Sequence, residues 1–121
     1  MAYEIGLATI TAEAGQDLSA KQFHFGTIAA DGQVDPTGAG LAADGVIEGK
    51  PSAAGTPFPF AVQPGQIVKV KAGAAITCGD LLEADAAGCA IKQTAGKILA
   101  KALAKAAAKD ELIPALLILQ R

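Results

Sequence analysis

Short apolar runs recur along the second half of the chain, and each one ends at a turn signal. The runs occupy residues 45–49, 67–70, 76–84, 98–104 and 112–119. Pro-Gly, Ala-Gly, Gly-Asp and Ala-Ala-Gly sequences separate several of them, at residues 64–65, 72–73, 79–80 and 86–88. This rhythm is typical of a small domain of short strands. We therefore expect an all-β fold with little helix.

The first half contains weaker strand signals. Residues 21–25 predict a strand with Phe23 and Phe25 on one face and His24 on the opposite, outward face. Asp31-Gly32 predicts a hairpin turn.

Two further stretches of the first half are interrupted by Gly and Pro. Residues 35–45 contain too little apolar mass to pack, so they predict a loop. In the strand predicted at residues 58–60, Pro59 indicates an edge or a strand beginning.

Residues 97–109 support two different structures. Helix propensity is high, and a lysine recurs at every fourth position, which places Lys97, Lys101, Lys105 and Lys109 on one stripe of a helix. A strand is the alternative, although it would mix leucines and lysines on one face. The residues alone leave both structures open.

Composition limits the size of the core. The chain has 121 residues, which suffices for one domain with at most an added arm. We expect an N-terminal arm over residues 1–20 and a single β domain over residues 21–121. Alanine supplies much of the apolar content, with four Phe, one Tyr and no Trp. Self-association would add stability to such a thin core.

The formal net charge of −2 gives no electrostatic reason to expect nucleic acid as a partner. The charge is uneven, because residues 1–60 hold two basic and seven acidic residues, whereas residues 61–121 hold eight basic and five acidic ones. Either the two halves pack on each other and neutralise the difference, or neighbouring subunits meet through opposite patches.

Targeting and membrane signals are not evident. The start of the chain lacks the basic and apolar regions of a signal peptide, and residues 112–119 are too few to span a bilayer. We expect a soluble protein made in the cytoplasm, with no membrane partner. Cys78 and Cys89 have neither metal-ligand nor disulfide-framework spacing. They predict buried free thiols, and a bond across the intervening hairpin is the alternative.

Catalytic motifs are missing from the sequence. His24 is the single histidine, and the sequence contains neither a Gly-x-Ser-x-Gly elbow nor a phosphate-binding loop. Asp80, Glu83 and Asp85 cluster, but a solvated hairpin end explains them more simply than a cation site. We therefore expect no enzyme activity, no catalytic residue, no metal, no cofactor and no small-molecule substrate.

The order of these elements resembles the capsid decoration, or cement, proteins of tailed bacteriophages, of the small β-domain type. The matching pieces are residues 18–23, 45–51, 53–55, 65–70, 72–82, 85–88 and 111–118. The resemblance implies a compact β-barrel or β-tulip fold. It also implies a homotrimer on the outer surface of the capsid, with the major capsid protein as its partner. Such proteins join after the shell expands and hold neighbouring capsomers together without any chemistry.

In that family, a strand and then an Ala-rich turn precede the closing strand. Together with Gly96 and the closing strand at residues 112–119, this order favours a strand over residues 98–104, since sheet pairing outweighs small differences in propensity. We expect two faces of that strand: Ile98, Ala100, Ala102 and Ala104 on one side, Leu99 and Leu103 on the other.

Lysines on the leucine face must reach solvent or pair with a carboxylate at a subunit boundary. Lys101 and Lys105 are therefore candidate residues of a subunit interface.

The arm is the candidate capsid-binding element. Its candidate residues are Tyr3, Glu4, Leu7, Thr9, Ile10 and Thr11. An extended arm could add a strand to an exposed edge of a capsid protein. Alternatively, residues 7–11 form the first strand of the domain's own sheet.

The sequence thus predicts a non-catalytic structural protein of the virion that bridges capsomers and stabilises the expanded shell. The alternative is a head-fibre base or a surface module that binds carbohydrate as an adhesin. Sugar sites usually offer aromatic platforms, and this chain has few aromatic residues to supply them.

Overall fold

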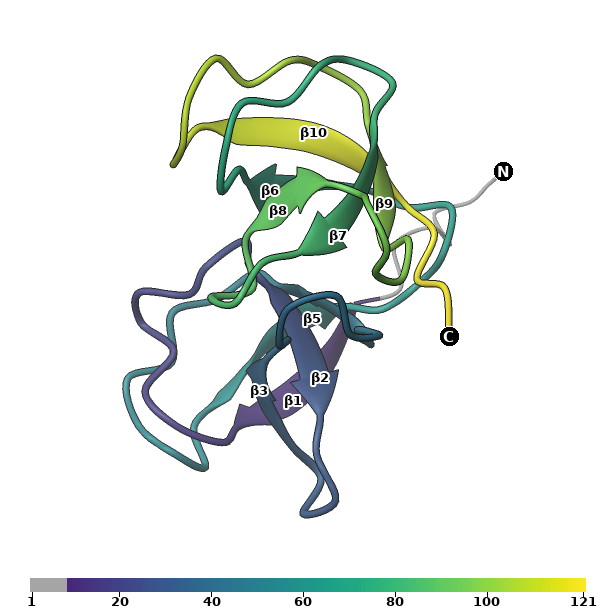
Figure 1. The fold of residues 1–121 in the computed structure, drawn as a ribbon. Helices are drawn as coiled ribbons and strands as arrows, with labels where there is room; N and C mark the ends of the chain where they lie inside the picture. Colours follow the sequence, from purple (N-terminus) through teal and green to yellow (C-terminus); the bar gives the residue numbers. More distant parts are fainter. Residues whose placement is uncertain (1–8) are drawn as a thin grey trace, which may run out of the picture.

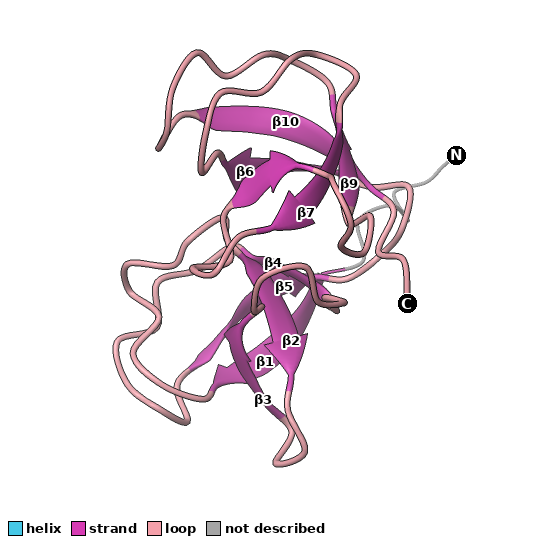
Figure 2. Ribbon diagram, viewed as in Figure 1, coloured by secondary structure: helices cyan, strands magenta, loops and turns pink. Residues whose placement is uncertain are grey.

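The computed structural model describes residues 9–121, which contain strands and turns but no helix (Figures 1 and 2). Its strands are β1 (Thr9–Ala14), β2 (Phe25–Ile28), β3 (Gln33–Pro36), β4 (Gly45–Ile47), β5 (Pro57–Ala61), β6 (Ile67–Lys71), β7 (Leu81–Ala84), β8 (Ala90–Lys92), β9 (Ala100–Ala102) and β10 (Leu112–Leu117). The prediction of an all-β fold is confirmed.

The strands form two lobes that follow each other along the chain. The first five close into a barrel in the order β1-β3-β2-β4-β5, and the last five form a sheet in the order β6-β10-β9-β7-β8. Figure 1 shows the barrel below the sheet, and the chain passes from the barrel to the sheet after β5. The acidic first half of the sequence therefore forms the barrel, and the basic second half forms the sheet.

Close strand pairing holds the barrel together. β1 pairs antiparallel with β5, from Thr9 opposite Ala61 to Glu13 opposite Pro57, and pairs parallel with β3. The inward side chains are Ala12, Ala14, Leu18, Val34, Ile47, Phe58 and Phe60. The Phe58 and Phe60 rings meet edge to face with their centroids 5.9 Å apart, which is a favourable aromatic geometry.

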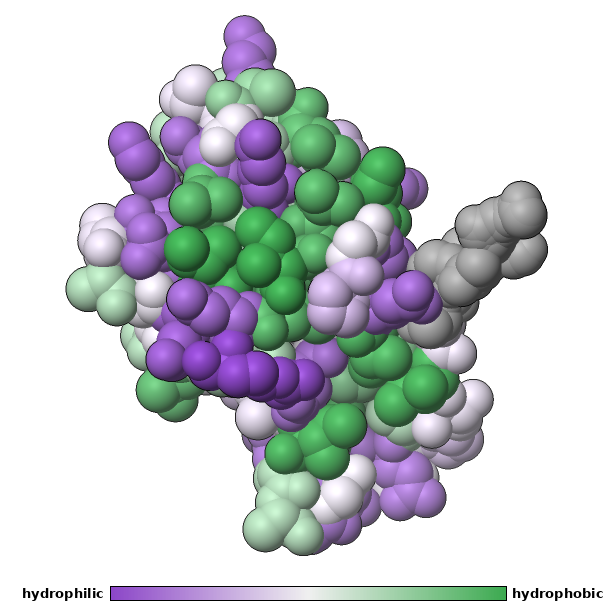
Figure 3. All heavy atoms as spheres, turned by 90° about the vertical axis from the view of Figure 1, so that its right-hand side faces the viewer, coloured by the Kyte–Doolittle hydropathy of each residue, from purple (hydrophilic) through white to green (hydrophobic). Residues whose placement is uncertain are grey.

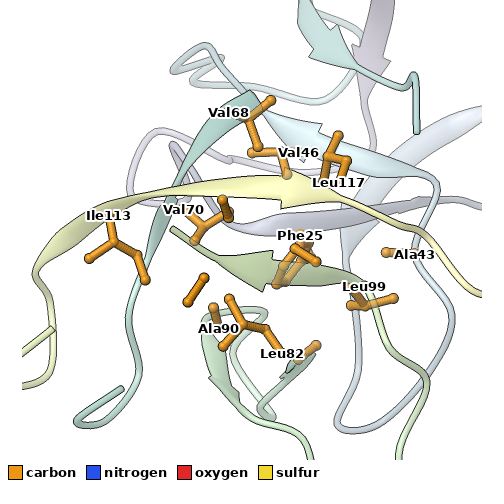
Figure 4. Close-up of a cluster of buried hydrophobic side chains, with 14 of the residues drawn as sticks. Phe25, Ala43, Val46, Val68, Val70, Leu82, Ala90, Leu99, Ile113 and Leu117 are labelled. Carbon is orange, nitrogen blue, oxygen red and sulfur yellow. The ribbon is translucent and has the colours of Figure 1, made fainter. Parts of the chain in front are cut away.

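The second sheet shares its core with the outside of the barrel. Alternate residues of β6 and β10 point inward, and the small residues of β9 and β8 do the same (Figure 4). This cluster continues through Phe25, Val46 and Ala61 of the barrel. Alanines on the inner face of the sheet allow the two lobes to approach closely, so both lobes belong to one packed unit.

Two prolines lie inside strands without breaking them. The carbonyl of Pro59 accepts a hydrogen bond from the Glu48 amide, just past the end of β4. The carbonyl of Pro114 accepts one from the Leu103 amide, just past the end of β9. The amide and carbonyl of a strand residue point to the same side. The nitrogen of each proline, which carries no hydrogen, therefore faces a position where the neighbouring strand has already ended.

The segment at residues 97–109 contains no helix. Ala100–Ala102 form β9, between β10 and β7, and Ala106 makes an isolated bridge to Ile76. Ala100 and Ala102 are buried while Lys101 is exposed, as the strand prediction requires. The prediction placed Leu99 on the same face as Lys101, and this is wrong. Leu99 precedes β9, where its amide donates to the Leu82 carbonyl, and its side chain is fully buried in the core.

Several predictions for the first half need correction. The chain enters β2 only at Phe25, so Phe23 and Phe25 do not share a strand face, and His24 is buried rather than outward. The loop predicted at residues 35–45 is shorter, because β3 extends to Pro36 and β4 begins at Gly45, and Thr37 and Ala43 are buried in it. The hairpin turn is confirmed, with Gly32 at φ 82° between β2 and β3.

Most of the expected arm that the structure describes lies within the barrel. Thr9, Ile10 and Thr11 belong to β1 and pair with β5, while Ala12, Ala14 and Leu18 are buried. For residues 9–11, the alternative prediction of a strand in the domain's own sheet is therefore confirmed. Tyr3, Glu4 and Leu7 lie outside the described residues.

Candidate functional site

The outward face of the second sheet combines exposed apolar side chains with lysines. Strand register forms three rows on this face: Ile67, Leu116, Lys101 and Leu81; Lys69 and Pro114; Lys71 and Leu112. Ile67 is 63% exposed and Leu112 is 47% exposed, which are high values for aliphatic residues in a sheet. No carboxylate lies in these rows, so the face is both apolar and basic.

Lys101 lies in the middle of this face. It is exposed and is paired across the strands with Leu116 of β10 and Leu81 of β7, so its leucine neighbours come from adjacent strands and do not include the predicted Leu99. Lys105 is exposed in the loop between β9 and β10. Neither lysine has a carboxylate partner within residues 9–121.

One side of the molecular surface carries both apolar and polar groups (Figure 3). On the side drawn in Figure 3, hydrophobic patches are broken up by hydrophilic side chains over both lobes. One ion pair of the described residues joins the lobes, between the Arg121 guanidinium and the Asp44 carboxylate. The other opposite charges of the two lobes form no ion pair within residues 9–121.

A groove follows the junction between the barrel and β6. It consists of two adjoining hollows of about 360 and 430 Å³ that share Phe23. The first is lined by Ser19, Ala20, Gln22, Phe23, Lys50, Lys71, Asp110 and Leu112, and the second by Phe23, Glu48, Ile67, Val68, Lys69 and Pro114. The outward residues of β6 thus form one wall of the groove.

Phe23 divides the groove and has an unusual backbone. Its φ is 67°, a left-handed conformation that costs a bulky residue free energy and marks sites where the surroundings impose it. Its amide donates to Ile47 of the barrel, and its carbonyl accepts from Lys71 of β6 at 3.0 Å. The Lys69 ammonium lies 6.0 Å from the centre of its ring. Both lobes therefore hold this aromatic side chain in the groove.

His24 and Cys89 form a buried pair between the lobes. The imidazole Nδ1 lies 3.2 Å from the Gln22 carbonyl, which can only accept, so Nδ1 carries the proton and Nε2 accepts from the Cys89 thiol at 3.2 Å. Burial lowers the pKa of His24, and burial raises the pKa of the Cys89 thiol. Both groups therefore stay neutral near pH 7, which is the opposite of an activated thiolate.

The acidic cluster shapes turns. Asp80 accepts from the Thr77 amide, and Asp85 accepts from the amides of Ala87 and Cys89. Glu83 is buried rather than solvated, and hydrogen bonds from the backbone amides of Thr94 and Gly96 lower its pKa. Within residues 9–121, no group of such side chains is arranged to hold a metal ion.

The two cysteines differ in their surroundings. Cys89 is buried as expected, whereas Cys78 is exposed, and both are free thiols. The alternative of a bond across the hairpin is therefore not realised.

No helix in the described part of the chain is long and apolar enough to cross a membrane.

The sequence predicted the exposed position of Lys101 but not the groove or the buried pair. Both depend on contacts between lobes that are distant in sequence, such as Phe23 with Lys71 and His24 with Cys89. The one local signal was Phe23 itself, an aromatic residue beside a polar turn.

Comparisons with known proteins found similarity at the level of the fold. No protein-family model matches the sequence, and no curated protein matches it. Among solved structures, the chain is similar to the head fiber gp8.5 N base of bacteriophage phi29, with a TM-score of 0.69 at 18% sequence identity. The alignment covers 94% of this chain and 96% of that chain, so the likeness includes both lobes.

Proposed function

We propose that this chain is a structural protein of a bacteriophage head, attached to the outer surface of the capsid. The observation that carries this proposal is the fold: both lobes, in their order, are similar to the base of a phage head fibre. The sequence resemblance to capsid decoration proteins independently suggests the same surface. Its partner there is the major capsid protein.

Two specific roles are compatible with that location. As a cement protein, a homotrimer would bridge neighbouring capsomers, and weak contacts from three subunits would add through effective concentration. As a head-fibre base, it would anchor a projecting fibre, and the solved neighbour favours this role. The two roles differ in how many copies a particle needs.

Self-association into a trimer is supported by the surface of the molecule. The barrel is acidic, the sheet is basic, and the outward face of β6, β10, β9 and β7 exposes Ile67, Leu112 and Lys101. A heterologous contact between the sheet of one copy and the barrel of the next would cover apolar area and pair opposite charges.

The described residues favour binding over catalysis or sugar recognition. The neutral His24–Cys89 pair is buried and offers no activated nucleophile. Phe25, Phe58 and Phe60 are buried, which leaves Phe23 as the accessible aromatic side chain of residues 9–121. One partly covered ring is a poor platform for a carbohydrate.

Stoichiometry in purified virions tests the proposal. We expect the chain to co-purify with mature heads, to be accessible to protease or antibody on intact particles, and to be absent from particles whose gene for this chain is disrupted. About one copy per major capsid subunit would indicate a cement protein, and a few copies per particle would indicate a fibre base. Absence from purified virions would contradict both roles.

A further inference from the structure

Strand β6 is at one edge of the second sheet and pairs with β10 alone among the described strands. The amides and carbonyls of Ile67, Lys69 and Lys71 point away from β10, because these residues alternate with the hydrogen-bonded positions of the ladder. The Lys71 amide confirms this direction, since it donates to Phe23 across the groove.

The edge from Ile67 to Lys69 is open. No backbone group within residues 9–121 pairs with the amide or carbonyl of Lys69 on this side. The hollow of about 430 Å³ is lined by Ile67, Val68 and Lys69 of this strand together with Pro114 of β10, and by Phe23 and Glu48 from the barrel side. An exposed edge with room beside it is a template for pairing with another extended segment.

Side chains around this edge define what would fit. A strand added beside β6 would extend the outward face formed by Ile67, Lys69 and Lys71, which contains lysines and no carboxylate. Acidic side chains opposite the two lysines would form favourable cross-strand pairs. Side chains at the alternate positions would point to the inner side of the sheet with the buried Val68 and Val70, where apolar residues fit.

We propose that the open edge of β6 and the groove at Phe23 bind an extended segment of another protein that alternates acidic and apolar side chains. The segment adds a strand to the sheet through backbone hydrogen bonds, and Lys69 and Lys71 select its charge. The left-handed backbone of Phe23 belongs to this site, because it holds the ring in the groove and ends the open edge at Lys71.

Two other occupants are less well matched. The chain's own residues 1–8 include one carboxylate, Glu4, for two lysines. A second copy would have to offer a free strand of the same kind, and the other edge strand, β8, carries Lys92. Both occupants are outcomes of the test below.

The test measures binding of short synthetic peptides to the isolated full chain. The probe is a blocked peptide of alternating Glu and Val; its controls are a Lys and Val peptide, a Glu and Val peptide of shuffled order, and a peptide of residues 1–8. We expect saturable binding of the alternating acidic peptide, about tenfold weaker binding after shuffling, and none for the basic peptide. Slower hydrogen exchange of the Lys69 amide in the complex would place the peptide on the edge.

A matched pair of variants separates the backbone from the charge. Lys69→Pro removes both the free amide and the ammonium, while Lys69→Gln removes the ammonium alone. Proline is tolerated at this position because the Lys69 amide does not join the ladder with β10. We expect Lys69→Pro to bind the acidic peptide about tenfold more weakly than Lys69→Gln.

Several results would overturn the proposal. Equal affinities of the two variants would mean that no strand is added. Binding of the residue 1–8 peptide in preference to the acidic one would identify the chain's own segment as the occupant. Concentration-dependent protection of Lys69 without any peptide would identify a second copy. Failure of all peptides to bind would mean that the lysines only deter pairing at an edge. None of these results depends on the stoichiometry in virions.

Discussion

The Sγ atom of Cys89 lies 3.2 Å from Nε2 of His24, and this contact joins the β7–β8 turn of the sheet to the chain that enters the barrel at β2. The amide of the next barrel residue, Phe25, donates to the Gly88 carbonyl at 2.8 Å beside it. A side-chain bond and a backbone bond therefore connect the lobes at one point. Buried hydrogen bonds of this kind set the relative position of packed elements because leaving either partner unsatisfied is costly.

Replacing the thiol should weaken the connection between the lobes. Cys89→Ala leaves Nε2 of His24 buried without a donor, so we expect the free energy of unfolding to fall by about 1–3 kcal/mol. Chemical denaturation measures this change. The exposed Cys78 provides the matched control, and Cys78→Ala should change stability by less than about 0.5 kcal/mol. Equal effects of the two substitutions would contradict the role given to the pair.

Stability should depend on pH through His24, the single histidine. Burial holds its pKa below the ordinary value of 6.5, with Lys21 and Lys71 adding to the effect, so the unfolded chain takes up a proton before the folded chain does. The free energy of unfolding should therefore be highest above pH 6.5 with respect to this group and fall as the pH drops from there toward the folded pKa.

Glu48 has the opposite effect on the pH dependence of stability, and single substitutions separate its contribution from that of His24. Burial raises the pKa of Glu48 above 4.5, so its contribution is present at lower pH and is lost as the pH rises through the folded pKa. Denaturation at pH 5–7 should show a smaller positive slope for His24→Gln and a steeper one for Glu48→Gln. An unchanged slope in His24→Gln would show that the imidazole does not titrate differently in the folded state.

Gly45 should be intolerant of any side chain. It precedes Val46, which pairs with Ala61 of β5, and a methyl group on Gly45 would collide with the Ala61 carbonyl oxygen. We expect Gly45→Ala to cost about 3 kcal/mol or more. Gly55 is a control that separates collision from backbone strain, because its φ is 85° but its surroundings are open. Gly55→Ala should cost about 1–2 kcal/mol in thermal or chemical unfolding.

Charge reversal on the outward sheet face should disrupt assembly without unfolding the chain. Lys101 is exposed between Leu116 and Leu81, so Lys101→Glu should change monomer stability by less than about 0.5 kcal/mol. Light scattering should show a trimer for the original chain and a smaller species for the variant. Lys105→Glu should act in the same direction, and Lys92→Glu, on exposed β8, is the control. A trimer that survives Lys101→Glu would exclude this face as the interface.

Deleting residues 2–8 tests the capsid-binding arm. The deletion leaves the pairing of Thr9–Glu13 with β5 in place, so we expect a folded domain with a nearly unchanged melting temperature. If Tyr3, Glu4 and Leu7 contact the capsid, binding to mature shells should be lost in a sedimentation assay. Retained binding would assign attachment to the folded domain instead.

The sequence alone determined the fold class and much of the local structure. Alternation and turn residues predict β6 and β10, and they place the hairpin at Asp31-Gly32, because period-two patterns and Asp-Gly pairs depend on a few neighbouring residues. The exposure of Lys101 between the buried Ala100 and Ala102 follows from the same alternation. These features require no knowledge of distant contacts.

Tertiary structure alone decided the rest. Residues 97–109 have the propensity of a helix, but pairing of β9 with both β10 and β7 and burial of Ala100 and Ala102 outweigh tenths of a kcal/mol per residue. His24 is buried because Cys89, far along the chain, supplies its hydrogen bond. The groove at Phe23 exists because the barrel and an edge strand meet there, and no local pattern encodes which strand becomes an edge.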